Sequence, residues 1–137
     1  MILIDTHALI WALYDSEKLS PAAARAIQMN DCCISIASLW EMSIKQAKGA
    51  LLLRDSIVSI ATRCEEMGVD ILPITPAHCQ RLQSLPDYHR DPFDRIIMAQ
   101  SLTEGYPLVT KDERIWAGYQ EVEKKLVNTA SRIQCKT

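Results

Sequence analysis

Four acidic residues far apart in the chain have the placement expected of a shared site: Asp5, Glu41, Asp94 and Asp112. Each follows an apolar, strand-like run or lies in the first turn of an expected helix. In a parallel sheet the carboxyl ends of the strands lie along one edge, and open α/β folds bind their ligands there. We therefore expect the four carboxylates to meet in one cleft.

Carboxylates gathered in one cleft repel one another unless protons or a cation neutralise them. Their hard oxygen atoms suit Mg²⁺ or Mn²⁺. A cation held in this way can position and deprotonate water and stabilise charge on a phosphoryl group. The acids thus predict a metal-dependent hydrolase of phosphodiesters, and this chemistry requires no nucleophilic side chain.

The first two acids also have structural explanations. Asp5 can cap a helix that begins at Thr6. Glu41 stands at the third helical position of an S-x-x-E capping box opened by Ser38, a position that accounts for it without any ligand. For these two residues the capping role and the metal role therefore both stay open.

The other two acids are open to the same alternative. Asp91 is placed to cap a helix whose first turn holds Asp94, where the helix dipole favours negative charge. Thr110 and Glu113 can cap the helix that includes Asp112. Capping does not explain why every acid falls at the same edge of the predicted sheet, and that coincidence favours the shared site.

The composition is that of a globular chain of one domain's length, 137 residues with 48% hydrophobic and 23% charged residues. A formal net charge of -2 provides no overall attraction to nucleic acid. Any nucleic-acid binding must therefore come from a local basic rim or through bound metal.

The cysteines lack C-x-x-C spacing and are odd in number, so they indicate neither a disulfide framework nor a zinc site. We interpret them as reduced thiols. The apolar amino-terminal segment is interrupted by Asp5 and His7 and follows no basic leader, which argues against a signal peptide or a membrane span. These features predict a soluble protein of the cytoplasm.

Strand-like runs alternate with helical patterns along most of the chain. Strands are expected at residues 1–4, 32–36, 69–74 and 107–110, and helices at residues 7–14, 21–29, 38–48, 55–67, 76–85, 91–104 and 112–119. Beyond residue 120 the pattern fades: residues 126–130 are the candidate for a last edge strand, and the tail is expected to be loose. This alternation predicts an α/β fold with a mostly parallel sheet covered on both faces.

Four strings contain these acids in order: ILIDTHALIW, ASLWEMSIK, HRDPFDRIIMAQS and PLVTKDERI. Together they resemble a PIN domain, and more closely the VapC-type toxins of type II toxin-antitoxin pairs. The resemblance extends from Met1 to about Trp116. It implies that residues 1–137 form one three-layer PIN-like domain, although the usual terminal strand is hard to place after Tyr119.

The resemblance implies an endoribonuclease that cleaves RNA with one or two divalent cations, Mg²⁺ or Mn²⁺. The residues that it implies as metal ligands and catalytic groups are Asp5, Glu41, Asp94 and Asp112. It also implies auxiliary roles for Thr6, Asp91 and Thr110. A cognate antitoxin and a homodimeric assembly are further expectations of the family.

Basic residues beside these strings are candidates for RNA contacts: Lys45, Arg90, Arg95, Lys111 and Arg114. Solvated surface charge is the alternative for each of them. Lys45 lies four residues after Glu41, so a helical ion pair competes with a phosphate contact there and is slightly favoured. His7 and His89 can reach a phosphate, but a structural or surface role is the more common one for a single histidine.

Large apolar residues are more frequent in the first part of the chain than its early helices require. For Leu51, Leu52 and Leu53 a core position and a partner groove that receives the antitoxin's amphipathic segment are equally supported. For Trp11 the core position is favoured.

Three other functions are alternatives for a chain of this kind. A phosphoacceptor receiver domain would need an acid pair after the first strand and an aspartate after the third, and a haloacid-dehalogenase-like phosphatase would need D-x-D where this chain has Asp5-Thr6-His7. The remaining rival is a catalytically silent PIN-like module that binds RNA or protein without cleavage. Retention of all four acids argues against such a silent site.

Overall fold

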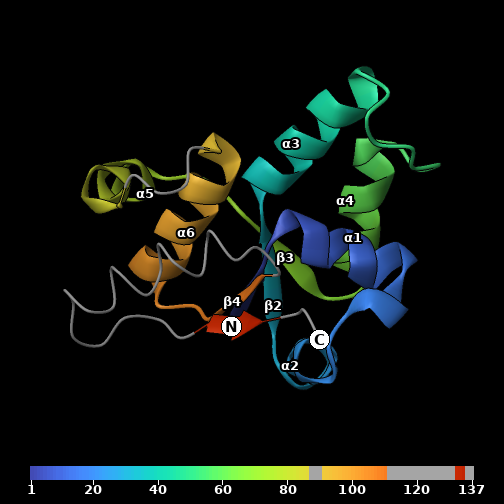
Figure 1. Cartoon of the computed structure of the whole chain (residues 1–137), viewed down its shortest axis with the longest axis horizontal. Coiled ribbons are helices and arrows are strands. Elements are labelled where there is room, and N and C mark those ends of the chain that lie inside the picture. Colours follow the sequence, from blue (N-terminus) through green and yellow to red (C-terminus); the bar gives the residue numbers. More distant parts are fainter. Residues whose placement is uncertain (87–90, 111–131, 135–137) are drawn as a thin grey trace.

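The computed structural model describes residues 1–86 and 91–110, and the backbone of residues 132–134. Figure 1 shows the helices and strands of these segments. In chain order they are β1 Ile2–Ile4, α1 Thr6–Tyr14, η1 Ser16–Lys18, α2 Pro21–Met29, β2 Cys32–Ser35, α3 Ile36–Ala47, α4 Ile57–Glu66, β3 Val69–Leu72, α5 Pro76–Arg81, η2 Leu82–Ser84, α6 Pro92–Glu104, β4 Leu108–Thr110 and β5 Arg132–Gln134.

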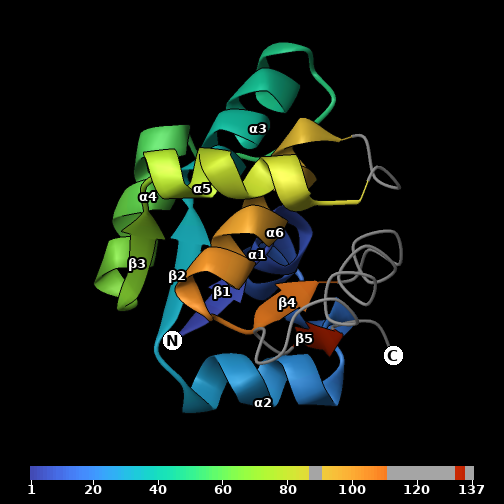
Figure 2. The ribbon, with the colours of Figure 1, turned by 90° about the vertical axis from the view of Figure 1, so that its left-hand side faces the viewer.

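The strands form one five-stranded sheet in the order β3-β2-β1-β4-β5, and every neighbouring pair is parallel. Figure 2 shows them side by side in this order. The central strand β1 pairs with β2 on one side and with β4 on the other. The predicted parallel sheet is therefore confirmed, and the carboxyl ends of all five strands lie along one edge.

Alternate residues of the strands supply two separate cores. Ile2 and Ile4 of β1 pack in one core with apolar residues of α1, α2, α3 and α4. Leu3 belongs to the other core, whose helical residues come mainly from α6. In Figure 1 α1, α3 and α4 accordingly lie on one side of the sheet, and α5 and α6 lie on the other. This confirms the three-layer α/β prediction.

Most predicted helix ends agree with the structure because their capping residues are strong signals. Ser20 caps α2 through its hydroxyl, and Pro21 occupies the first helical turn. Asp91 caps α6 in the same way. Gly105 ends α6 with φ of 74°, a left-handed conformation that glycine adopts without steric cost.

The predicted start of α3 is wrong. The helix begins at Ile36, and its N-cap is Ser35, whose Oγ accepts a hydrogen bond of 3.0 Å from the Ala37 N–H. Ser35 ends β2 opposite Leu72, so the chain can turn into the helix directly after the last strand pair. Ser38 therefore lies inside the helix, and Glu41 lies beyond its first turn and is no part of a capping box.

The predicted loose tail is also wrong for residues 132–134, which form β5 beside β4. A strand of three residues is too short to show an alternating pattern, so only its pairing reveals it. The helix expected at residues 112–119 and the strand expected at residues 126–130 lie outside the described residues. Among the helices that the structure describes, none is long and apolar enough to cross a membrane.

Candidate active site

The carboxyl edge of the sheet is where the first of the four acids lies. Asp5 directly follows β1, and its backbone N–H donates a 3.0 Å hydrogen bond to the Val109 carbonyl of β4. Thr110, the last residue of β4, is buried beside this position. Parallel pairing therefore places Asp5 and Thr110 together at the predicted edge.

Asp5 caps the start of α1, one of the two roles that its position in the sequence allowed. One carboxylate oxygen, Oδ1, accepts a hydrogen bond of 2.8 Å from the Ala8 N–H at the start of α1. The residue is only 4% exposed, which is unusual for an aspartate that serves as a cap alone. A buried carboxylate is costly unless partners compensate its charge, and the Ala8 N–H supplies one such contact.

Glu41 is the clearest functional candidate in the described part of the chain. It is 5% exposed, and its Oε2 atom forms a 2.9 Å ion pair with Lys45 Nζ one turn later on α3. Its other oxygen, Oε1, is buried and accepts no hydrogen bond from any described residue. The ion pair predicted for Lys45 is thus confirmed, while Oε1 retains unused capacity to bind a ligand.

Asp94 lies half-buried in the first turn of α6. Capping of that helix is carried out by Asp91, whose Oδ1 accepts hydrogen bonds from the Phe93 and Asp94 N–H groups at 2.9 and 3.3 Å. The Asp94 side chain is therefore not required as a cap. The rings of Trp40 and Phe93 meet edge to face at 5.0 Å and so join α3 to α6 immediately beside Glu41 and Asp94 in the sequence.

A hydrogen bond between two buried hydroxyls links the first two acidic segments. Thr6 Oγ1 donates to Ser38 Oγ at 2.9 Å, and the two residues are 3% and 0% exposed. Thr6 directly follows Asp5, and Ser38 lies one turn before Glu41 on α3. Reading Ser38 as a helix cap missed this role, although its three-residue spacing from Glu41 was a usable signal.

The donor chemistry of these residues fits a hard divalent cation, because carboxylate and hydroxyl oxygens are its preferred ligands. The unpartnered, buried Oε1 atom of Glu41 is the atom that such a cation would satisfy. Within the described residues, no three His, Cys, Asp or Glu side chains are grouped tightly enough to hold a metal ion unaided. The fourth predicted ligand, Asp112, lies outside those residues, and so does Lys111.

The residues predicted to contact RNA have different surroundings in the structure. Arg95 donates from Nη1 to the Pro86 carbonyl at 2.7 Å and from Nη2 to the Leu82 carbonyl at 3.4 Å, which ties the start of η2 and the segment after it to α6. Its contact with RNA stays a prediction. His7 is exposed, with its ring 6.5 Å from that of Trp11. The residues His89, Arg90 and Arg114 lie outside the described part of the chain.

The three leucines after α3 do not share one environment. Leu51 and Leu53 pack against the larger core, whereas Leu52 is 90% exposed. Only Leu52 is therefore available to a partner in the way that the groove hypothesis requires. Trp11 packs against the same core, as predicted.

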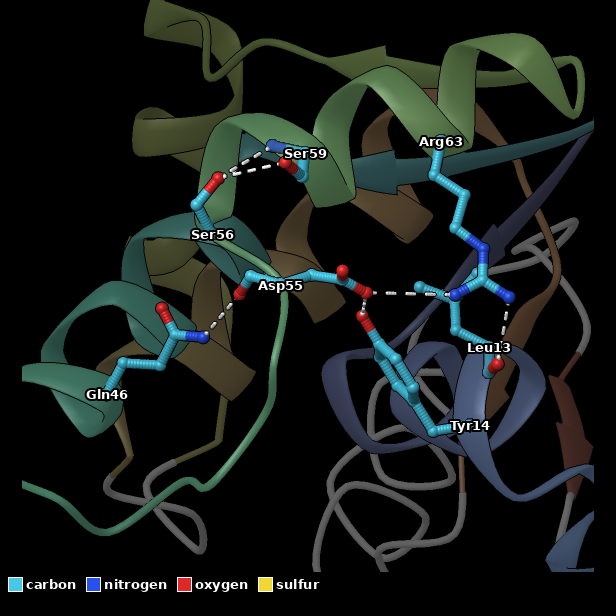
Figure 3. A network of polar contacts seen from close by, with 7 residues as sticks. All are labelled: Leu13, Tyr14, Gln46, Asp55, Ser56, Ser59 and Arg63. Carbon is cyan, nitrogen blue, oxygen red and sulfur yellow. Dashed lines mark hydrogen bonds and ion pairs between the residues drawn. The ribbon is translucent and has the colours of Figure 1, made fainter.

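A polar network holds the segment that carries these leucines in place (Figure 3). Asp55 accepts a hydrogen bond from the Tyr14 hydroxyl and lies 3.9 Å from Arg63 Nη1, while its backbone carbonyl accepts from Gln46 Nε2 at 3.0 Å. Desolvation, followed by the hydrogen bond to Asp55, raises the pKa of Tyr14 to about 12. The phenol therefore keeps its proton at neutral pH, and the network joins α1, α3 and α4.

An apolar cavity of about 410 Å³ opens between α3, α5 and α6. Trp40, which is 59% exposed, and Phe93 contribute to its wall. The full lining is Trp40, Ile74, Cys79, Leu82, Pro92, Phe93 and Ile96.

Comparison with known proteins identifies the family. The chain matches the PIN domain family over residues 2–122. It is 30% identical over 116 residues to Ribonuclease VapC22 of Mycobacterium tuberculosis, an alignment that covers 83% of this chain and 88% of that protein.

Two solved structures share the fold at low sequence identity. VapBC2 from Rickettsia felis, bound to a DNA fragment from its promoter, has a TM-score of 0.62 at 13% identity, covering 99% of this chain and 100% of that chain. FitAB bound to an IR36 DNA fragment has a TM-score of 0.63 at 16% identity, covering 98% and 94%. The sequence match and the shared fold both agree with the resemblance found in the four sequence segments that contain the acids. The chain therefore belongs to the PIN domain family.

Proposed function

We propose that this protein is a divalent-metal-dependent endoribonuclease and the toxin of a toxin-antitoxin pair. The observation that carries the proposal is the buried Glu41 carboxylate, which keeps an oxygen without a hydrogen-bond partner among the described residues. The relative named Ribonuclease VapC22 supports the reaction class, and the family supports the fold in which the acids occur.

Asp5, Glu41, Asp94 and Asp112 would hold the cation, with Mg²⁺ or Mn²⁺ as the fitting ions. When bound, such a cation supplies Lewis acidity toward a phosphodiester and lowers the pKa of a coordinated water. The chain's own residues prepare this site. Asp5 is oriented by the Ala8 N–H, and Lys45 holds one oxygen of Glu41 and leaves the other available.

The experiment compares RNA cleavage by the wild-type chain and Asp94→Asn, in Mg²⁺ or Mn²⁺ and after chelation. The substitution retains the side-chain shape while removing a charge, and Asp91 remains as the cap of α6. We expect cleavage to be abolished and stability to fall by about 1 kcal/mol or less. Chelation should abolish wild-type cleavage as well.

Asp15→Asn is the matched control, because Asp15 is a partly exposed surface acid paired with Lys18 at 3.1 Å. It should cleave RNA like the wild type. Unchanged cleavage by folded Asp94→Asn would refute the catalytic assignment. A wild-type chain that binds RNA but never cleaves it would favour the silent RNA-binding module instead.

The partners that we propose are an RNA substrate, a cognate antitoxin and a second copy of the chain, acting in the cytoplasm. The two neighbours of like fold are described as VapBC2 and FitAB bound to DNA, which supports a partnered toxin. The apolar cavity bordered by Trp40 and Phe93 is a described surface suited to a homodimer contact. Sedimentation of the purified chain measures this assembly.

A further inference from the structure

The buried hydroxyl pair of Thr6 and Ser38 has more hydrogen-bonding capacity than the surrounding protein uses. Each hydroxyl carries one proton, and a single hydrogen bond of 2.9 Å joins the two oxygens. The proton of Thr6 occupies that bond. The proton of Ser38 has no acceptor among the described residues, although this side chain is fully buried.

The pair also joins the two segments that present Asp5 and Glu41. Thr6 begins α1 directly after Asp5, whereas Ser38 belongs to α3 and lies on the same side of that helix as Glu41. The hydrogen bond therefore restrains the distance between α1 and α3 at the point where their carboxylates emerge. The Ser38 hydroxyl, whose proton has no acceptor among the described residues, and Glu41 Oε1, which accepts no hydrogen bond from them, therefore belong to the same part of the fold.

We propose that Ser38 and Thr6 form a positioning pair that sets the cation affinity of the acidic site. The pair fixes the spacing of Asp5 and Glu41, and the remaining Ser38 proton is available to an oxygen atom bound with the cation. The inference rests on the proposed metal site and extends it to Ser38. Groups that orient metal ligands commonly change metal affinity by about 10-fold to 100-fold when they are removed.

The experiment measures Mn²⁺ binding by calorimetry in the absence of RNA, with cleavage kinetics as a second readout. Thr6→Val and Ser38→Ala should each weaken Mn²⁺ binding by about 10-fold. The double variant should bind Mn²⁺ no more weakly than Ser38→Ala alone, because Ser38→Ala already lacks the hydrogen bond that Thr6→Val removes. Thr6→Ser, which keeps the hydroxyl, should restore the wild-type affinity.

Ser43→Ala is the control on the same helix, since the Ser43 hydroxyl donates to the Leu39 carbonyl of its own helix at 2.9 Å. It should bind Mn²⁺ like the wild type. Thermal unfolding of all variants in chelator separates loss of the fold from loss of the site. Thr6→Ser provides a folded test of the hydroxyl if Thr6→Val fails to fold.

Two results would overturn the positioning pair: a Ser38→Ala affinity equal to that of the wild type, or equal losses in Ser38→Ala and Ser43→Ala. Mn²⁺ binding by the wild type without RNA cleavage would refute the ribonuclease and leave the pair standing. A wild-type chain that binds no Mn²⁺ would refute the pair together with the metal site.

Discussion

At the scale of single residues, the acids differ in whether they cap a helix and in how deeply they are buried. Asp91 caps α6 and is partly accessible to solvent, whereas Glu41 is buried and caps nothing. Asp5 combines both properties, because it caps α1 while being almost inaccessible. The Glu41 carboxylate is buried with one oxygen unpartnered among the described residues, which indicates a function that offsets its desolvation.

This reasoning predicts the behaviour of Glu41→Gln. Removal of a buried charge should leave the metal-free protein as stable as the wild type or more stable by about 1 kcal/mol, because functional sites are often built at a cost in stability. The substitution also removes the ion pair with Lys45, but this loss should lower stability only slightly, since the Lys45 side chain is 40% exposed.

Thermal unfolding with and without Mn²⁺ checks the prediction. The metal-induced rise in the melting temperature should disappear in Glu41→Gln. A metal-free melting temperature several degrees below that of the wild type would show instead that Glu41 serves the fold.

The cysteines allow a second prediction at this scale. Cys32, Cys33 and Cys64 are buried, and Cys79 is exposed. Burial raises the pKa of all three buried thiols, to about 12 for Cys33. A raised pKa lowers the fraction of reactive thiolate, so iodoacetamide at pH 8 should modify Cys79 and spare the other three.

Mass spectrometry of the native protein in a Cys135→Ser background checks this pattern, because Cys135 lies outside the described residues. After denaturation all four remaining cysteines should react. Rapid modification of native Cys33 would be incompatible with its burial between the sheet and α6.

At the scale of elements, the segment between α3 and α4 is held firmly and still presents an apolar side chain to solvent. Asp55 connects it to Tyr14 of α1 and Arg63 of α4 (Figure 3). Because Leu51 and Leu53 face the core, Leu52 is fixed facing outward. Contacts that hold this segment before a partner arrives reduce the conformational entropy that the segment loses on binding.

Leu52→Glu should therefore weaken antitoxin binding by about 10-fold or more, while RNA cleavage by the free chain is unchanged. Titration calorimetry with the antitoxin and a cleavage assay on the same preparation check both halves of the prediction. Val58→Glu is the control, because Val58 is also exposed, at 76%. Normal affinity of Leu52→Glu would remove Leu52 from the groove, and parallel losses of binding, cleavage and melting temperature would assign it to the core.

The sequence predicted elements well where a local signal decides them. Ser20, Asp91 and Gly105 mark helix ends through their own side chains or conformations, and all three positions agree with the structure. The start of α3 was misplaced because Ser35 and Ser38 are both good caps. Pairing of β2 with β3 decides between them, and pairing is a property of the tertiary structure.

The candidate site was predictable to the same extent. Placement of Asp5 and Thr110 at one edge follows from parallel strands, which the alternation of elements predicts. The Thr6–Ser38 hydrogen bond joins residues distant in the sequence and leaves no periodic pattern. Long-range side-chain contacts of this kind become visible only when the helices are packed.

At the scale of the whole molecule, β5 is the last strand at one end of the sheet. β5 pairs with β4 over Leu108–Thr110 and covers a strand edge that would otherwise be open. A chain that stops after Ala130 should lose about 3 kcal/mol of stability through the missing hydrogen bonds and should aggregate.

Size-exclusion chromatography and thermal unfolding check this prediction. A chain that stops after Gln134 keeps β5 and is the matched control. Equal melting temperatures for the two truncated chains would show that β5 contributes nothing to stability.

The strand order has a consequence for synthesis on the ribosome. Asp5 and Glu41 are made early, but β4, which completes the surroundings of Asp5, is added only after Asp94. At about 5–20 residues per second, the amino-terminal half must wait several seconds for its partners. The proposed acidic site therefore cannot assemble on a half-made chain, and the proposed ribonuclease would become able to cleave RNA only when translation is nearly complete.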